Sequence, residues 1–189
     1  MSCKQKFCKG LLRMMGWKME GNVIPDKQCI ILGAPHTTIW DFIVSYLFYA
    51  TLGGKAYCMI KSTFFFPPLG WILKGMGGIP VTQNNRAVFV RQIIKAFKEH
   101  PQLQLAIAPE GTRSRNDHWK TGFHLIAKTV NVPVYLGFFD WGTKTVGVGP
   151  KLELTDDAKA DLKRARQWYK DRGVVGKYPE KFSTGTDLE

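Results

Sequence analysis

The chain has 189 residues, of which 44% are hydrophobic and 13% aromatic, enough to bury the core of a single domain. Its formal net charge of +12 favours anionic partners such as phospholipid headgroups, phosphorylated cofactors or nucleic acid, without choosing among them. The four cysteines lack the spacing of a zinc or C-x-x-C redox site, and no apolar run reaches the ~20 residues of a membrane-spanning helix.

The N-terminal segment carries a broad apolar arc with basic residues mostly opposite. The arc consists of Phe7, Leu11, Leu12, Met14 and Met15, and the basic residues are Lys6, Lys9 and Arg13. This pattern predicts an amphipathic helix within residues 1–20, and the excess of Lys over acidic residues favours contact with an anionic membrane surface. Docking of the same helix on the protein core is the alternative. The scattered Lys and Arg interrupt any apolar stretch, which argues against a secretory signal.

Residues 21–189 are expected to form a single α/β domain. Compact apolar runs that end at Gly, Pro or a charged turn predict strands at residues 28–32, 56–60, 103–108 and 134–139, with 145–148 as a further edge strand. Because helical segments alternate with these runs, we expect a central, largely parallel or mixed sheet flanked by helices.

Two helices follow from periodicity and capping. Val90, Ile93, Ile94 and Phe97 recur at helical spacing, which predicts a helix with one face packed on the sheet. A charged helix is expected from Asp156 and Asp157 to about Arg172, with Gly173 as its C-cap, and the last dozen residues are expected to fray.

An aromatic, proline-broken segment at residues 64–68 is expected to be a loop rather than a regular element. Its phenylalanines either turn inward over a sheet edge or lie outward, toward lipid or over a substrate site. His100, His118 and His124 show no metal-ligand spacing and are interpreted as surface or cap residues.

The chemistry is expected at His36 and Asp41. An apolar strand delivers both residues into a turn and the start of a helix, and active sites of open α/β sheets lie beyond the carboxyl ends of strands. A carboxylate five residues after a His can fold back to meet one ring nitrogen, leaving the other to accept a hydroxyl proton. Taken alone, this H-x4-D spacing is also typical of a His that caps or packs at a strand end.

Three further segments accompany the pair in a fixed order. The first runs over residues 61–81 and contains Pro67-Pro68, Gly70 and Gly77-Gly78-Ile79-Pro80; the second is Glu110-Gly111-Thr112-Arg113; the third is Trp119-Lys120-Thr121-Gly122, ahead of Val132-Pro133-Val134. With these blocks, residues 28–140 resemble the glycerolipid acyltransferase family, the 1-acylglycerol-3-phosphate acyltransferases and their relatives.

The resemblance implies that His36 is the general base and Asp41 the carboxylate that orients it. It also implies a substrate-binding set that holds the acceptor and its phosphate: Glu110, Gly111, Thr112, Arg113, Gly78, Ile79 and Lys61. Arg113 offers a bidentate fork for phosphate oxygens. Glu110 is expected to hold Arg113 or its loop in place, the alternative being a plain surface turn.

One departure from the family pattern concerns the phosphate. The family's glycine and isoleucine block runs on through Val to Asp-Arg, whereas Thr82 and Gln83 follow Val81 here. Arg86 either substitutes for the missing Arg or lies on the exposed face of the following helix. Pro35 and Leu136 are smaller departures, and neither removes a catalytic group.

The expected function is acyl transfer from acyl-CoA or an acyl carrier protein to the hydroxyl of a lysolipid, with 1-acylglycerol-3-phosphate giving phosphatidic acid. No cofactor or metal is expected beyond that co-substrate. The expected partners are the donor, the lysolipid and an anionic membrane surface, with the protein attached peripherally to the cytoplasmic face and no nucleic acid bound. The alternatives are a lipid acceptor without glycerol phosphate, a hydrolase, and a non-catalytic basic module that coats membranes or nucleic acid.

Overall fold

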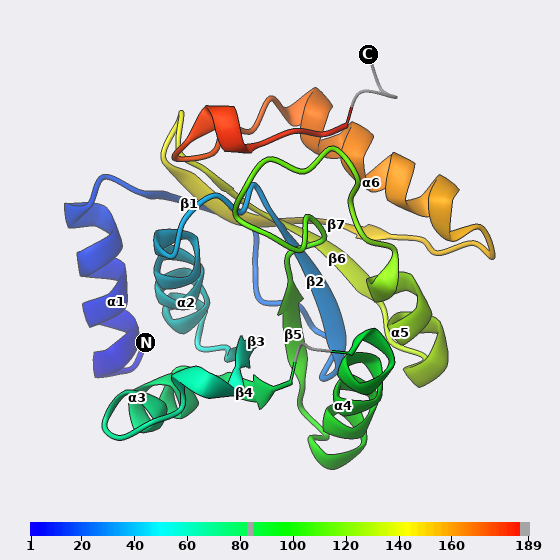
Figure 1. The fold of residues 1–189 in the computed structure, drawn as a ribbon. Coiled ribbons are helices and arrows are strands. Elements are labelled where there is room, and N and C mark those ends of the chain that lie inside the picture. The colour runs from blue at the N-terminus through cyan, green and yellow to red at the C-terminus, as the bar shows by residue number, and fades with distance from the viewer. Residues whose placement is uncertain (83–84, 186–189) are drawn as a thin grey trace.

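The computed structural model of the chain describes residues 1–82 and 85–185, and for Arg86 the backbone alone. Seven strands form one sheet in this part of the chain, and six α-helices flank it (Figure 1). The strands are β1 (Lys18–Glu20), β2 (Cys29–Ala34), β3 (Ala56–Lys61), β4 (Gly78–Val81), β5 (Gln104–Ile107), β6 (Val134–Asp140) and β7 (Thr145–Leu152). The α-helices are α1 (Cys3–Met14), α2 (Trp40–Leu52), α3 (Leu69–Gly75), α4 (Arg86–Glu99), α5 (Gly122–Val130) and α6 (Ala158–Arg172).

The sheet is mixed and largely parallel, as predicted. Its strand order is β1-β7-β6-β2-β5-β3-β4, and only β6 and β7 pair in the antiparallel sense. Strand β7 extends the predicted 145–148 segment, but it is not an edge strand because β1 pairs along its outer side. The five strands β2 to β6 point the same way, so their carboxyl ends share one end of the sheet, with β2 at its centre.

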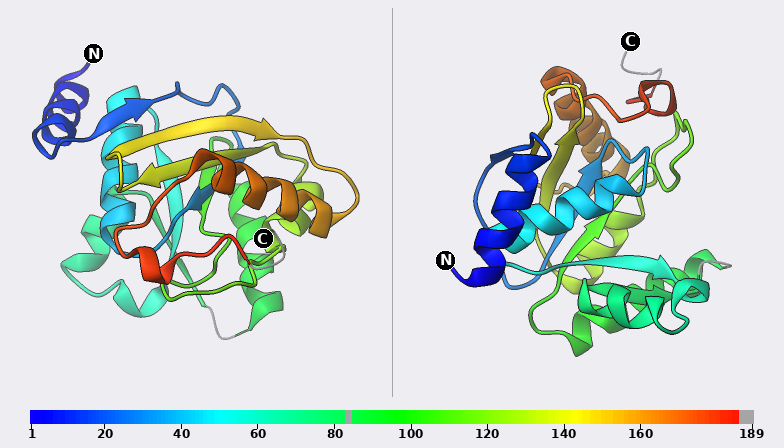
Figure 2. Two further views of the ribbon diagram at one scale, coloured as in Figure 1. Left: turned by 90° about the horizontal axis from the view of Figure 1, so that it is seen from above. Right: turned by 90° about the vertical axis from the view of Figure 1, so that its left-hand side faces the viewer.

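Helices cover both faces of the sheet (Figure 2). Helices α1 and α2 lie on one face, and α4, α5 and α6 lie on the other. Strand β2 supplies both cores by simple alternation: Ile30, Leu32 and Ala34 face the α4 to α6 side, whereas Cys29 and Ile31 face α1 and α2. This burial on both faces explains why β2 has a continuous apolar sequence rather than an alternating one.

The predicted N-terminal helix is docked on the core along one face. Cys8 and Leu12 of α1 are buried in the cluster that includes α2. Phe7 and Met14 remain 69% and 80% exposed on the same helix. Docking therefore holds for one face of α1, and two large apolar side chains are left uncovered on another.

The aromatic segment turns outward. Phe64 and Phe66 are 50% and 55% exposed, so of the two alternatives the outward one holds for these residues. Residues 62–64 form a short 3-10 turn, and Pro68 caps α3, a helix that the proline and glycine content of the segment conceals. Trp71 and Ile72 of α3 are also exposed, which extends the apolar surface.

The two predicted helices are confirmed. Ile93 and Phe97 are buried along one face of α4, and α6 begins at the N-cap Asp157 and ends at Gly173 in the left-handed conformation. Residue Tyr169 of α6 is fully buried, and its hydroxyl lies 2.7 Å from the carbonyl oxygen of Leu32 and 3.0 Å from that of Gly137. Helix α6 is thereby joined to the middle of β2 and β6.

The expectation that the last dozen residues fray is wrong for residues 178–185, which make ordered contacts, and residues 186–189 lie outside the described part of the chain. Residues 174–185, here called the C-terminal strap, cross the carboxyl end of the sheet. The Trp141 backbone N–H donates to the Val175 carbonyl, and the Trp119 indole N–H donates to the Ser183 carbonyl at 2.8 Å. Local sequence gives no sign of these contacts because both partners lie in distant loops.

Candidate active site

His36 and Asp41 meet at the carboxyl end of the central strand. Strand β2 stops at Ala34, and a five-residue turn leads into α2, whose second residue is Asp41. The His36 Nδ1 atom lies 3.3 Å from Asp41 Oδ2. The His36 side chain is 26% exposed whereas that of Asp41 is fully buried. Within the described residues the other ring nitrogen, Nε2, has no hydrogen-bond partner, so it can accept a proton from a bound hydroxyl.

The carboxylate of Asp41 is held by three N–H donors besides the imidazole. The backbone N–H groups of Thr37 and Thr38 each donate to Oδ2 at 2.8 Å, and the Trp141 indole N–H donates to Oδ1 at 2.7 Å. The two backbone donors tie the turn to the first turn of α2. Because the carboxylate accepts hydrogen bonds on both oxygens, its direction relative to His36 is fixed.

Trp141 is a site residue that the sequence analysis missed. It follows β6, the strand next to β2, so its indole reaches Asp41 from 100 residues away. The one available signal is its place directly after an apolar strand whose carboxyl end lies beside that of β2. That signal identifies the end of the sheet but not the partner.

Glu110 holds the other side of the His36 turn. It follows β5, and its Oε1 accepts a hydrogen bond from the His36 backbone N–H at 2.6 Å. The side chain is buried, which rules out the plain surface turn. The expected contact with Arg113 is also wrong: Arg113 is exposed, and no ion pair among the described residues involves it. The buried Glu110 carboxyl reaches the His36 turn of the neighbouring strand, whereas Arg113 faces the solvent.

The rest of the E-G-T-R block forms an exposed turn. Gly111 has φ +70°, a conformation that favours glycine, and its N–H donates to the Ala108 carbonyl. Thr112 and Arg113 follow on the surface beyond the carboxyl end of β5, the strand adjacent to β2. Their position leaves the Arg113 guanidinium available to an anionic ligand.

The glycine and isoleucine block lies further from His36. Strand β4 is three strands from β2, roughly 14 Å at the usual strand spacing. Gly78 begins β4 and packs so closely on the Leu73 carbonyl that a side chain would clash, and Ile79 packs on the core. Lys61 is exposed at the end of β3. The Arg86 side chain and Gln83 lie outside the described residues.

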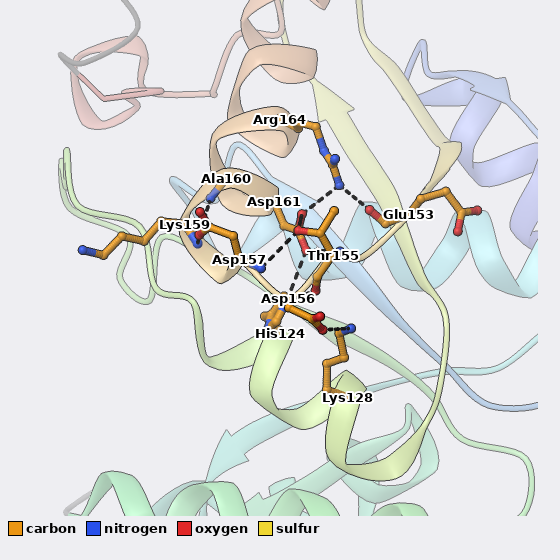
Figure 3. Close-up of polar contacts among 10 residues, drawn as sticks. All are labelled: His124, Lys128, Glu153, Thr155, Asp156, Asp157, Lys159, Ala160, Asp161 and Arg164. Atoms are coloured by element: carbon orange, nitrogen blue, oxygen red, sulfur yellow. Dashed lines mark hydrogen bonds and ion pairs between the residues drawn. The ribbon is translucent and has the colours of Figure 1, made fainter.

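A second His–Asp pair lies elsewhere, at the start of α6 (Figure 3). His124 Nε2 lies 3.1 Å from Asp161 Oδ2 and 3.0 Å from the Thr155 carbonyl, and both side chains are buried, so the surface interpretation of His124 is wrong. Thr155 and Arg164 also donate to Asp161. These contacts join α5 to the loop before α6, which gives the pair a structural explanation.

Among residues 1–82 and 85–185 no cluster of three His, Cys, Asp or Glu could hold a metal ion.

The environment of Glu110 changes its titration. Burial raises the pKa of Glu110, the hydrogen bond from His36 lowers it in part and the charge of Asp41 raises it, so that the pKa lies at about 8. The ordinary pKa is 4.5, so between these two values the unfolded chain has lost a proton that the folded chain keeps. The free energy of unfolding therefore falls as pH rises through this window, by up to about 5 kcal/mol.

We predict that Glu110→Gln removes this loss of stability, because the amide is neutral at every pH and its oxygen can still accept from His36. Urea unfolding of both proteins at pH values between 5 and 9 measures the effect. The free energy of unfolding of the wild type should decline relative to that of the variant, and most of the decline should be complete above pH 8. Parallel curves across the range would contradict a buried, neutral Glu110.

Comparisons with known proteins identify the family and the fold. A model of the acyltransferase family matches residues 17–140. Among solved structures, the crystal structure of the 1-acyl-sn-glycerophosphate (LPA) acyltransferase PlsC from Thermotoga maritima is similar in fold, with a TM-score of 0.62 and 16% sequence identity over 91% of this chain and 79% of that chain. No curated protein sequence matches. The family match covers more than half of the chain and includes its H-x4-D and E-G-T-R blocks, so the chain belongs to the acyltransferase family and is an enzyme that transfers acyl groups.

Proposed function

We propose that this acyltransferase moves a fatty acyl group from acyl-CoA or an acyl carrier protein to the hydroxyl of 1-acylglycerol-3-phosphate, giving phosphatidic acid. The observation that carries the proposal is the contact between His36 Nδ1 and the buried Asp41 at the carboxyl end of β2, in a chain of the acyltransferase family. The fold likeness to an enzyme named for lysophosphatidic acid supports the choice of acceptor.

In the proposed reaction His36 acts as general base. Its Nε2 removes the proton of the acceptor hydroxyl while the oxygen attacks the thioester carbonyl, forming the C–O bond and a tetrahedral oxyanion. The carbonyl then reforms, the C–S bond breaks, and the departing sulfur takes the proton from His36. The Asp41 carboxylate, which lies against Nδ1, stabilises the imidazolium that forms in between.

Direct transfer is favoured over an acyl-enzyme. Burial raises the pKa of the Cys29 thiol to about 12, and burial also raises that of Cys58 to about 12. Thiols with such values are protonated at neutral pH and are poor nucleophiles. Cys8 is buried, and Cys3 lies on the exposed side of α1. The sequence contains no G-x-S-x-G elbow to supply a serine instead.

A second candidate acceptor is a lipid hydroxyl without glycerol phosphate. The observation that favours it is Gln83, which stands where the family has a phosphate-binding Arg. The exposed Arg113 still offers one cation on the β5 side of the site.

We further propose that the enzyme works on the cytoplasmic face of an anionic membrane. Exposed apolar side chains on α1 and around α3, together with the net charge of +12, support attachment to an anionic membrane. They are Phe7, Met14, Phe64, Phe66, Trp71 and Ile72. No helix among the described residues is long and apolar enough to cross a bilayer.

The proposed reaction is tested by thiol release from long-chain acyl-CoA in lipid micelles, with and without lysophosphatidic acid. We expect release that depends on the acceptor and that falls at least 100-fold in His36→Ala, as for loss of a general base (~10² or more). Near-native turnover by the variant would show that His36 is not the general base. Release without acceptor would show a thioesterase, and a preference for a phosphate-free lysolipid would favour the second acceptor.

Membrane attachment is tested by sedimentation with anionic phospholipid vesicles. The double variant Phe7→Ser, Trp71→Ser removes two side chains that are 69% and 70% exposed, and it should bind these vesicles several-fold less tightly because less apolar area enters the interface. Leu125→Ser is the matched control, since Leu125 is 57% exposed but lies on α5, on the other face of the sheet. Equal weakening by the control, or no change in the double variant, would refute the assigned surface.

A further inference from the structure

The C-terminal strap sits directly on the turn that carries His36. The Tyr178 backbone N–H points to Thr37 Oγ1 at 3.4 Å, and a side chain built on Gly176 would lie 2.6 Å from the Thr37 methyl group. Thr37 follows His36 and donates its own N–H to Asp41. Residues 176–178 are therefore packed against the catalytic turn, although they are remote in sequence and beyond the residues that match the family model.

The strap places a cation beside the His36–Asp41 pair. The ammonium of Lys177 lies 5.0 Å from the ring centroid of Trp141 and 5.5 Å from that of Trp40. Trp141 is the residue that donates to Asp41, and Trp40 precedes Asp41 in α2. The Lys177 charge is thus held over aromatic rings at the β6 side of the site, opposite the β5 side where Arg113 lies.

The charge of Lys177 is not neutralised by the described part of the protein. Neither Lys177 nor Lys181, whose ammonium lies 4.4 Å from the Tyr178 ring centroid, is within ion-pair distance of a carboxylate in residues 1–82 and 85–185. Contacts with aromatic faces position an ammonium group without cancelling its charge or using all three of its N–H donors. Lys177 remains exposed, so a ligand can reach it.

We propose that Lys177, with Lys181 nearby, forms a phosphate-binding site that holds a phosphate-bearing substrate at the mouth of the active site. The inference rests on the proposed acyl transfer and specifies how this chain, with Gln83 in place of the family's Arg, binds phosphate. A compact ammonium near the turn that carries the general base can hold a phosphate group while the reacting groups reach His36. The phosphate belongs either to the acceptor or to the CoA of the donor.

The test compares Lys177→Met and Lys177→Arg with Lys55→Met. Lys55 is a matched control because its ammonium also lies over a ring, 4.9 Å from the centroid of Tyr57, but at the amino end of β3, away from His36. Loss of the Lys177 charge should raise KM for the phosphate-bearing substrate about tenfold, the effect of one charge-assisted hydrogen bond, with kcat changed less than twofold. Lys177→Arg should restore most of the affinity, and Lys55→Met should have no effect.

Phosphate-free substrates identify the source of the phosphate. A rise in KM for lysophosphatidic acid but not for monoacylglycerol assigns the site to the acceptor. A rise for acyl-CoA but not for S-acyl-pantetheine assigns it to the donor. Unchanged KM for every phosphate-bearing substrate, or an equal rise with the phosphate-free substrates, would overturn the proposal.

Equilibrium binding separates this inference from the reaction itself. If the wild type transfers no acyl group, the proposed function fails, but binding of glycerol 3-phosphate and of CoA can still be followed by tryptophan fluorescence, since Trp40 and Trp141 lie against Lys177. At least one of the two ligands should bind several-fold more tightly to the wild type than to Lys177→Met. Equal affinities for both ligands would reject the Lys177 site whatever the enzyme's activity.

Discussion

A carboxylate removed from water needs hydrogen-bond donors, and Asp41 obtains them from two parts of the chain. The turn after β2 gives two backbone N–H groups, the loop after β6 gives the Trp141 indole, and the remaining contact is with His36. The position of Asp41 in the first turn of α2 adds the favourable field of a helix N-terminus. Because the Trp141 backbone N–H donates to the Val175 carbonyl, the C-terminal strap is linked through Trp141 to Asp41.

His36 lies between two buried carboxyl groups with different surroundings. Asp41 accepts hydrogen bonds on both oxygens and faces the imidazole. Among the described residues, the Glu110 carboxyl accepts one hydrogen bond, from the His36 backbone N–H, and burial raises its pKa. This difference suits different tasks: one group orients the ring, and the other fixes the main chain that carries it. Glu110 follows β5, and Trp141, which donates to Asp41, follows β6. Because β5 and β6 lie on either side of β2, the sheet itself sets the position of the base.

The sequence predicts what depends on local pattern and misses what depends on distant partners. Apolar runs locate β2, β3, β5 and β6, helical periodicity locates α4, and the five-residue spacing of His36 and Asp41 predicts their contact. Strands β1 and β4 were missed because three or four residues, with a mixed or proline-containing sequence, carry too little periodicity. The partners of Glu110, Trp141 and Tyr178 lie 74, 100 and 141 residues away, and no local pattern reveals such pairings.

Asp41 is proposed to hold His36 as a base with Nε2 free, and the tautomer of the His36 imidazole reports whether it does. Nitrogen NMR of labelled protein, with the His36 signals assigned by their loss in a His36 variant, measures which ring nitrogen carries the proton in neutral imidazole. The structure predicts the proton on Nδ1, where Asp41 Oδ2 accepts it, and an unprotonated Nε2. In Asp41→Asn this preference should weaken or reverse. A wild-type ring protonated on Nε2, or a tautomer that does not change in Asp41→Asn, would show that Asp41 does not orient His36 as a base.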